Sequence, residues 1–272
     1  MTFTELSLFT GAGGGVLGSI LLGHRVVGYV ENNEYCQKII AQRIKDGFFD
    51  EAPIYGDIRD FNSQGYAESY KGLVDVVSGG FPCQPFSNAG KLQAENDARN
   101  MWPETAKTIS IIKPQHVLLE NVPGISKYLP VVVRDLRRIG YSVRRPAIIA
   151  AASMGAGHLR RRIWVYANFN EARQQNFNGE PTTKAERNIR GSACLENSET
   201  ISSDTDREWK LQPQGDVKKQ WEWVGDCGWW KAEPDMVRVV YGVPNGMDRI
   251  AALGNAQIPL MAATAWKILS GE

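Results

Sequence analysis

The first half of the chain alternates short apolar runs with segments whose apolar residues recur at helical spacing. The runs that predict strands are LSLF (6–9), RVVGYV (25–30), IYGDI (54–58), VDVVSGG (74–80) and HVLLE (116–120). Between them, residues 16–22 and the segment through Cys36, Ile40 and Ile44 predict helices. Strands that alternate with helices imply right-handed crossovers. We therefore expect a mostly parallel, doubly wound α/β sheet of the Rossmann-like type, with helices on both faces.

The pattern changes near the middle of the chain. Residues 142–150 and 161–167 are close enough in sequence to form an antiparallel pair at one edge of the sheet. Beyond them the chain becomes polar, and five tryptophans then crowd together: Trp209, Trp221, Trp223, Trp229 and Trp230. We predict a small, irregular second domain over 168–245. A helical pattern near the end predicts a return to the first domain, which then comprises 1–167 and 246–272.

Composition narrows the class of protein. Of 272 residues, 43% are hydrophobic and 22% are charged, as in soluble globular proteins. No apolar run is long enough to span a bilayer, and the N-terminus has no secretory pattern. The four cysteines are scattered, without a CxxC pair that would suggest zinc. We therefore expect a reduced, cytoplasmic protein without membrane or metal, in which a special cysteine is catalytic.

The charge distribution leaves a nucleic-acid partner open. The net charge is only +1, but arginines gather between Lys127 and Arg162 against a single acid, Asp135. A basic zone of this kind could face phosphates. A solvated helix face explains Arg134 to Arg138 equally well.

A nucleotide-binding pattern lies between the first two predicted strands. Gly13, Gly15 and Gly18 satisfy G-x-G-x-x-G, and Glu31 ends the second strand, where an acid binds ribose hydroxyls. Such a carboxylate serves NAD and S-adenosylmethionine equally well, so these residues leave the cofactor open. Glycines used only for a tight strand–helix turn are the structural alternative.

The loop GGFPCQPFSNAG (79–90) points to nucleophilic chemistry. It places Cys83 just past the carboxyl end of the fourth predicted strand, where ligands gather in open α/β sheets. A structural cysteine would normally lie inside the apolar run. An ordinary thiol has a pKa of about 8.5, so a nucleophilic role requires a nearby positive charge, which Arg160 and Arg162 could supply.

Five short motifs follow one another along the chain: FTGAG (9–13), PCQ (82–84), ENV (120–122), the pair Arg160 and Arg162, and GNAQIP (254–259). In this order they resemble the motif series of the C5-cytosine-specific DNA methyltransferases of bacteria and phages. The resemblance covers residues 5–167 and about 249–270. It implies a DNA (cytosine-5)-methyltransferase with S-adenosylmethionine as cofactor and double-stranded DNA as partner. We expect it to act as a monomer.

The resemblance assigns roles that the chemistry of cytosine requires. Carbon 5 is a poor nucleophile, and addition of the Cys83 thiolate to carbon 6 turns the ring into an enamine. Glu120, held protonated by desolvation at a buried strand end, would assist at N3. Arg162 would hold the carbonyl oxygen of the base, and Arg160 completes the predicted catalytic set. Loss of the C5 proton and expulsion of Cys83 would then give 5-methylcytosine.

The same resemblance predicts the cofactor site. Its residues are Phe9, Gly11, Gly13, Glu31, Asp57, Ile58, Pro82 and Asn255. Glu31 would bind the ribose, and Asp57 and Ile58 would meet the adenine. Pro82 and Asn255 would close the pocket near the methionine end. Two residues have plainer alternatives: Phe9 as part of the core, and Asp57 as the cap of a helix that begins near Asp60.

The chain departs from the family pattern at several positions. Ser7 stands where an acid is usual, and Gly157 and His158 replace a common proline and glutamine. Residues 237–250 occupy the place of the penultimate motif, which is hard to recognise here. The recognition region is short, which leaves the mode of DNA reading open.

A cytosine stacked in duplex DNA would have to be flipped out to reach this sheet edge. The polar loop from Ser87 to Asn100 is long enough to close over it. Competing functions are an RNA cytosine methyltransferase, a non-catalytic DNA-binding relative and a nicotinamide-dependent oxidoreductase. The RNA-methylating branch carries a Cys-Phe-Thr element that the second domain here lacks. The oxidoreductase leaves PCQ and ENV without a role.

Overall fold

Strands and helices alternate along the chain as the apolar pattern predicts. The structure, a computed structural model, describes residues 2–82, 100–169 and 256–271. Its strands are β1 (Thr4–Leu8), β2 (Arg25–Val30), β3 (Ile54–Tyr55), β4 (Val76–Gly79), β5 (His116–Asn121), β6 (Tyr141–Val143), β7 (Ala147–Ala150) and β8 (Arg161–Phe169). Its helices are α1 (Gly14–Leu21), α2 (Glu34–Lys45), α3 (Ile58–Ser63), α4 (Tyr66–Ser69), α5 (Trp102–Ile112), α6 (Leu129–Arg138) and α10 (Pro259–Ser270). Two 3₁₀ turns cover Pro123–Lys127 and Ala151–Met154.

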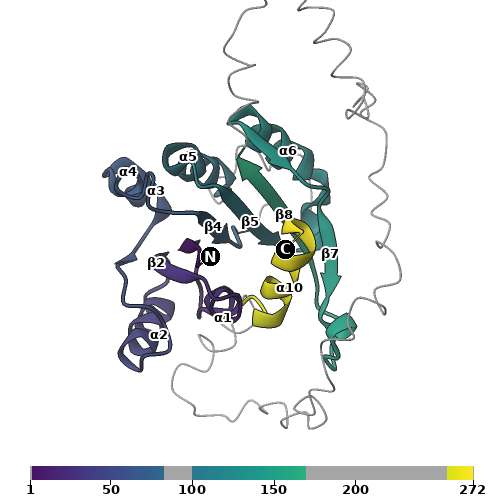
Figure 1. Cartoon of the computed structure of the whole chain (residues 1–272), viewed down its shortest axis with the longest axis horizontal. Helices are drawn as coiled ribbons and strands as arrows, with labels where there is room; N and C mark the ends of the chain where they lie inside the picture. Colours follow the sequence, from purple (N-terminus) through teal and green to yellow (C-terminus); the bar gives the residue numbers. More distant parts are fainter. Residues whose placement is uncertain (1, 83–99, 170–255, 272) are drawn as a thin grey trace, which may run out of the picture. The chain divides into compact units, whose positions relative to one another are not determined.

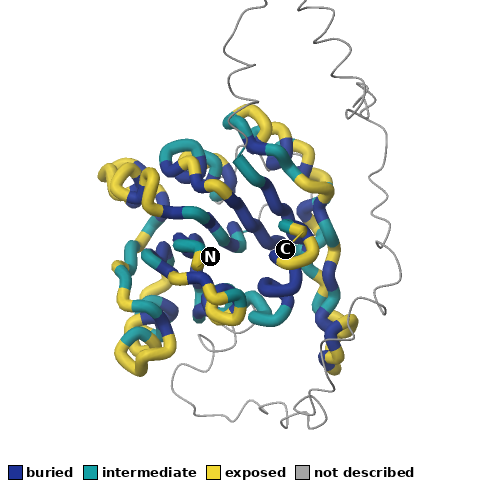
Figure 2. The backbone as a smooth tube through the Cα atoms, viewed as in Figure 1, coloured by how far each residue is buried: buried dark blue, intermediate teal, exposed yellow. Residues whose placement is uncertain are grey.

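The strands form one sheet in the order β3-β2-β1-β4-β5-β8-β6, and β7 also pairs with β8. Strands β1 to β5 run parallel, whereas β8 runs antiparallel to β5, β6 and β7. Helices α1, α2 and α10 lie along one side of the sheet and α3 to α6 along the other (Figure 1). The central strands between these layers are mostly buried (Figure 2). The predicted doubly wound α/β fold is confirmed.

One predicted strand is shorter in the structure. The strand expected over 54–58 stops at Tyr55, because Asp57 accepts a hydrogen bond from the Arg59 N–H at 2.8 Å and α3 already begins at Ile58. The predicted antiparallel pair is present at one end of the sheet: β6 and β7, which overlap the segment predicted over 142–150, both pair with β8. On its other side β8 pairs with β5, which joins the pair to the parallel strands.

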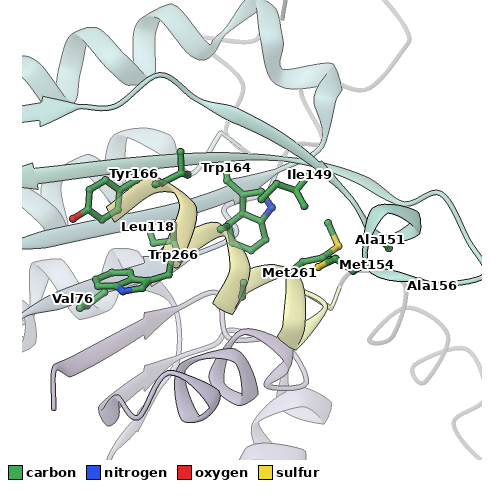
Figure 3. Packing of buried hydrophobic residues seen from close by; sticks show 13 residues of the cluster. Val76, Leu118, Ile149, Ala151, Met154, Ala156, Trp164, Tyr166, Met261 and Trp266 are labelled. Atoms are coloured by element: carbon green, nitrogen blue, oxygen red, sulfur yellow. The ribbon is translucent and has the colours of Figure 1, made fainter. Parts of the chain in front are cut away.

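The C-terminal segment lies against the first half of the chain. Helix α10 contacts α1, β7 and β8. Its Met261 and Trp266 belong to one buried cluster with Trp164 of β8 (Figure 3). Close approach of α10 to α1 requires Gly18, since a Cβ there would lie 2.8 Å from the Cβ of Ala262. Each large apolar side chain buried in such a cluster contributes about 1.5–3 kcal/mol.

Strand β8 continues to Phe169, so residues 168 and 169 belong to the sheet. The remainder of the second domain predicted over 168–245, with its tryptophan cluster, lies outside the described residues.

A cluster of buried polar side chains connects β1, α1 and β4. Glu5 is 2% exposed, and its Oε1 accepts hydrogen bonds from Ser19 Oγ at 2.7 Å and from Ser78 Oγ. Its Oε2 lies 2.7 Å from Nδ1 of His24. Strand β1 leads into the glycine-rich turn and β4 leads into the cysteine loop. Glu5 therefore keeps the strands before these two loops in register.

We expect Glu5→Ala to lower the free energy of unfolding by about 3 kcal/mol, because it leaves the buried His24 without its partner, removes the acceptor of Ser78 and removes one of the two acceptors of Ser19. Urea denaturation measures the loss, and Glu51→Ala at an exposed position is the matched control. A loss below about 1 kcal/mol would show that the cluster contributes little to stability.

Candidate active site

A cleft of about 1110 Å³ opens at the carboxyl edge of the sheet. Loops that follow β1, β2, β3, β4 and β5 line it, and this is the edge at which open α/β sheets bind ligands. The predicted site residues on its wall are Phe9, Gly11, Glu31, Asp57, Ile58, Pro82, Glu120 and Arg162. The fold thus brings most of the predicted set to one cleft.

The backbone directly after β1 is strained. Phe9 has a φ of 50° and Gly11 a φ of 58°, both in the left-handed region. Such a conformation costs a residue other than glycine about 1–3 kcal/mol, and strain of this kind clusters at ligand sites. Phe9 is half-buried and lines the cleft. A Cβ at Gly11 would meet nothing within 4 Å, so glycine is required there by its backbone angle, not by lack of space.

Glu31 joins the loops that follow β1 and β2. Its Oε2 accepts a hydrogen bond from the Gly11 N–H at 2.6 Å, and its Oε1 accepts one from the Asn33 N–H at 2.7 Å. A carboxylate accepts about four hydrogen bonds. Each oxygen therefore keeps the capacity to accept one more, which suits the paired hydroxyls of a ribose.

Asp57 has a structural role in addition to its place on the cleft. Its side chain caps α3 through the Arg59 N–H, and its Oδ2 lies 2.6 Å from Nη2 of Arg59. The hydrogen bond from Arg59 holds the pKa of Asp57 below its ordinary value. The helix-cap alternative is thus present in the structure, and contact of Asp57 with adenine stays a prediction.

The antiparallel pairing of β5 and β8 brings a carboxyl and a guanidinium group together. Asn121 lies opposite Ile163, so Arg162 comes next at the cleft end of β8. Nε of Arg162 lies 2.7 Å from Oε1 of Glu120, and the two side chains are 17% and 9% exposed. Two residues that are far apart in the sequence thereby place a guanidinium group against a buried carboxyl group beside the cleft.

Burial raises the pKa of Glu120 above its ordinary value. The charges of Arg162 and Arg160 and a hydrogen bond from Gln257 act in the opposite direction without cancelling the rise. A carboxyl group in this environment keeps its proton more readily than one in water. It can therefore serve as a proton donor to a ring nitrogen at the cleft.

Arg160 and Asn121 hold the segments that surround this carboxyl. Nη2 of Arg160 donates a hydrogen bond to the carbonyl oxygen of Ala256, and Arg160 itself is not among the cleft-lining residues. Burial, followed by the charge of Arg162, lowers the pKa of Arg160. Nδ2 of Asn121 donates to the carbonyl oxygen of Phe81 at 2.9 Å, just before the cysteine loop. In the sequence Asn121 is marked only by its place in ENV (120–122), and no role is predicted for it.

Two glycines of the G-x-G-x-x-G pattern make room for the C-terminal segment. A Cβ at Gly15 would lie 2.4 Å from Oε1 of Gln257, and one at Gly18 would lie 2.8 Å from the carbonyl oxygen of Pro259. Gly13 is described but is not among the cleft-lining residues, and a Cβ there would lie 2.4 Å from Cζ of Phe49. Packing therefore explains part of this pattern.

A family model described as C-5 cytosine-specific DNA methylase matches residues 3–223. The chain belongs to this family. It is 32% identical over 177 residues to the Type II methyltransferase M.NgoMIV of Neisseria gonorrhoeae, covering 63% of this chain and 53% of that protein. It is 32% identical over 170 residues to M.HpaII of Haemophilus parainfluenzae, covering 60% and 45%. The chain thus spans about half the length of these relatives.

A solved structure of the Entamoeba histolytica methyltransferase EhMeth has the same fold. Its TM-score to this chain is 0.56 at 16% identity, and the match covers 100% of this chain and 98% of that one. This likeness concerns the arrangement of strands and helices alone.

Several positions expected from the family motifs lie outside the described residues. They include Cys83 and Asn255, the cysteine loop up to residue 99, and 237–250. Their neighbours are described: Pro82 lines the cleft, and Ala256 accepts the hydrogen bond from Arg160. Pro82 thus lies at the cleft directly before Cys83, and Ala256, directly after Asn255, contacts Arg160.

The predicted basic zone is only partly explained. Arg134, Arg137 and Arg138 are exposed on α6, whose opposite face is buried, and none of them lines the cleft.

Over 2–82, 100–169 and 256–271, no group of His, Cys, Asp and Glu side chains is arranged to hold a metal. The helices within those ranges are too short or too polar to cross a membrane.

We expect Glu31→Ala to weaken binding of S-adenosylmethionine about 5- to 100-fold, since it removes the acceptors for the ribose and for the Gly11 N–H, worth about 1–3 kcal/mol. Asp57→Ala should weaken binding as well and also destabilise α3, at a cost of about 1 kcal/mol for the lost cap. Titration calorimetry measures both affinities, with exposed Glu68→Ala as the control. Wild-type affinity in both site variants would place the cofactor elsewhere.

Proposed function

We propose that this chain transfers a methyl group from S-adenosylmethionine to carbon 5 of a cytosine in duplex DNA, through a covalent intermediate on Cys83. The observation that carries the proposal is the pair of Glu120 and Arg162 at a cleft that is also lined by Pro82, the residue before Cys83. N3 and the carbonyl oxygen of cytosine lie side by side on one edge of the ring, since both are bonded to carbon 2. A protonated carboxyl beside a guanidinium group can meet both at once.

The residues that line the cleft fit the proposed cofactor. S-adenosylmethionine supplies a methyl group on a positively charged sulfur, which leaves as a neutral thioether. Glu31 would accept hydrogen bonds from the ribose hydroxyls. Asp57 and Ile58 would contact the adenine, and Gly11 would allow close approach of the ligand to the backbone. A nicotinamide cofactor would leave Glu120 and Arg162 without a chemical role.

The protein groups act in a defined order. Cys83 Sγ, as a thiolate, forms a bond to carbon 6 of cytosine while Glu120 gives its proton to N3. The electron pair displaced from the C5–C6 double bond makes carbon 5 nucleophilic, and carbon 5 takes the methyl group. A base then removes the C5 proton, and those electrons restore the double bond as the bond from Sγ to carbon 6 breaks. Glu120 recovers its proton from N3.

The proposed substrate is duplex DNA, from which the target base must be flipped, at a cost of a few kcal/mol. We assign base reading to residues 170–245, since 168 and 169 belong to β8. We expect a monomer, and we expect it in the cytoplasm because a free catalytic thiol persists in a reducing compartment. Exchange of 170–245 for the corresponding segment of a relative should change the methylated site. Bisulfite sequencing would detect the change, and an unchanged site would contradict the assignment.

We expect duplex DNA containing 5-fluorocytosine to trap the enzyme, because fluorine cannot leave carbon 5 as a cation. The complex should survive denaturing electrophoresis, require S-adenosylmethionine and map by mass spectrometry to the peptide with Cys83. Cys83→Ala should abolish the adduct and turnover, whereas Cys194→Ala and Cys227→Ala should leave both intact. Methylation at carbon 5 by Cys83→Ala would refute the mechanism.

Glu120→Gln tests proton donation in the 5-fluorocytosine adduct assay, because glutamine has nearly the same size and shape as glutamate. The amide keeps an oxygen toward Arg162 but cannot protonate N3, so adduct formation should slow about 10²- to 10⁴-fold. DNA binding, measured by gel shift, should be nearly unchanged. Equal rates in the variant and the wild type would remove Glu120 from the mechanism.

A further inference from the structure

Gln257 joins the catalytic carboxyl to the C-terminal segment. It lies two residues before α10, and its side chain hydrogen-bonds Glu120. The carboxyl group of Glu120 and the amide of Gln257 both lie next to Gly80. A Cβ built on Gly80 would lie 2.7 Å from Oε2 of Glu120 and 3.2 Å from Nε2 of Gln257. Since Oε1 of Glu120 already faces Arg162, the Gln257 amide lies on the side of the other carboxyl oxygen.

The opposite end of the Gln257 amide lies against the start of α1. A Cβ at Gly15 would be 2.4 Å from its Oε1, and one at Gly14 would be 2.0 Å from its backbone carbonyl oxygen. The first turn of a helix presents N–H groups that have no partner within the helix. The amide oxygen therefore lies at the start of α1, and the amide nitrogen lies on the side of the carboxyl group. The nitrogen is the atom that can donate a hydrogen bond to Glu120.

We propose that Gln257 is a positioning residue for Glu120, which it holds toward the cleft by donating a hydrogen bond from Nε2 while Oε1 packs against Gly15 at the start of α1. The inference rests on the proposed function, in which Glu120 gives a proton to cytosine. It also gives Gly14, Gly15 and Gly80 a common role, since a side chain at any of them would displace Gln257 or Glu120. Correct packing of the C-terminal segment thus becomes a condition for catalysis.

The hydrogen bond donated by Gln257 also affects the pKa of Glu120. The charged groups that face this carboxyl are Arg162 and Arg160, and both favour the ionised form, as the Gln257 amide does. Removal of the amide therefore raises the pKa of Glu120 further. Because Glu120 acts in its protonated form, the alkaline limb of the rate profile moves to higher pH when the amide is lost.

Gln257→Met tests the proposal in the full-length protein, since methionine keeps the length of the side chain but cannot donate. Turnover on duplex DNA with labelled S-adenosylmethionine should fall about 10- to 100-fold, the expected effect of a misplaced catalytic group. Affinity for S-adenosylmethionine should stay within about twofold, and the alkaline limb should move upward. Gln64→Met, at an exposed position, should behave as wild type.

Gln257→Glu is the second variant and decides the question if Gln257→Met fails to fold. At high pH its carboxylate repels Glu120, whereas at low pH its protonated carboxyl donates in place of the amide. Its deficit relative to wild type should therefore shrink as the pH falls. A deficit independent of pH would indicate a packing role only and would overturn the proposal.

Adduct formation on duplex DNA with all cytosines replaced by 5-fluorocytosine separates the two hypotheses. If the wild-type protein forms no adduct, the proposed function is wrong. If the wild type forms the adduct and Gln257→Met forms it at the same rate with the same pH profile, the role of Gln257 is wrong and the proposed function stands.

Discussion

The burial of one carboxyl group, Glu120, is the constraint on which the rest of the site depends. A carboxyl removed from water requires charged or hydrogen-bonding partners, because an unpaired one is costly. Its partners come from two distant segments: Arg162 from β8 and Gln257 from the chain before α10. The antiparallel position of β8 beside β5 brings Arg162 to this carboxyl group. The packing of the C-terminal segment against α1 brings Gln257 to it. The same contacts of Glu120 therefore hold distant segments together and set the environment in which Glu120 would donate its proton.

The glycine-rich turn meets two requirements with neighbouring residues. Gly11 takes a left-handed backbone angle on the cleft side and donates its N–H to Glu31. Gly15 and Gly18, further along, leave space for Gln257 and α10. One short stretch thus lines the cleft and admits the segment that reaches Glu120. Packing accounts for Gly15 and Gly18 without any ligand contact.

Rigid packing below the cleft supports strained loops above it. The Glu5 cluster ties β1 to β4 with buried hydrogen bonds, and the aromatic cluster around Trp164 and Trp266 joins β8 to α10. Phe9 can keep an unfavourable backbone angle because the strand before it is held on both sides. A site on such a scaffold keeps its geometry because packed strands and helices hold its residues in place.

Local patterns in the sequence were sufficient to locate most of the strands and to predict the edge of the sheet at which the site lies. The segment predicted over 25–30 is β2, and 116–120 agrees with β5 to one residue, because side-chain periodicity is a local property. Parallel strands share a carboxyl edge, so Glu31 and Glu120 could be expected at one cleft before any coordinates. The family motifs added the chemistry.

Only the tertiary structure decided which distant groups meet. No local pattern encodes that β8 inserts between β5 and β6, and this order is what pairs Arg162 with Glu120. The hydrogen bond between Gln257 and Glu120 joins residues about half the chain length apart, and in the sequence only its place in GNAQIP marks Gln257. For Asp57 the sequence left a cofactor ligand and a helix cap as alternatives, and the structure shows the cap. Periodicity reports which face of an element is buried, whereas contacts between distant elements depend on how all the buried faces pack together.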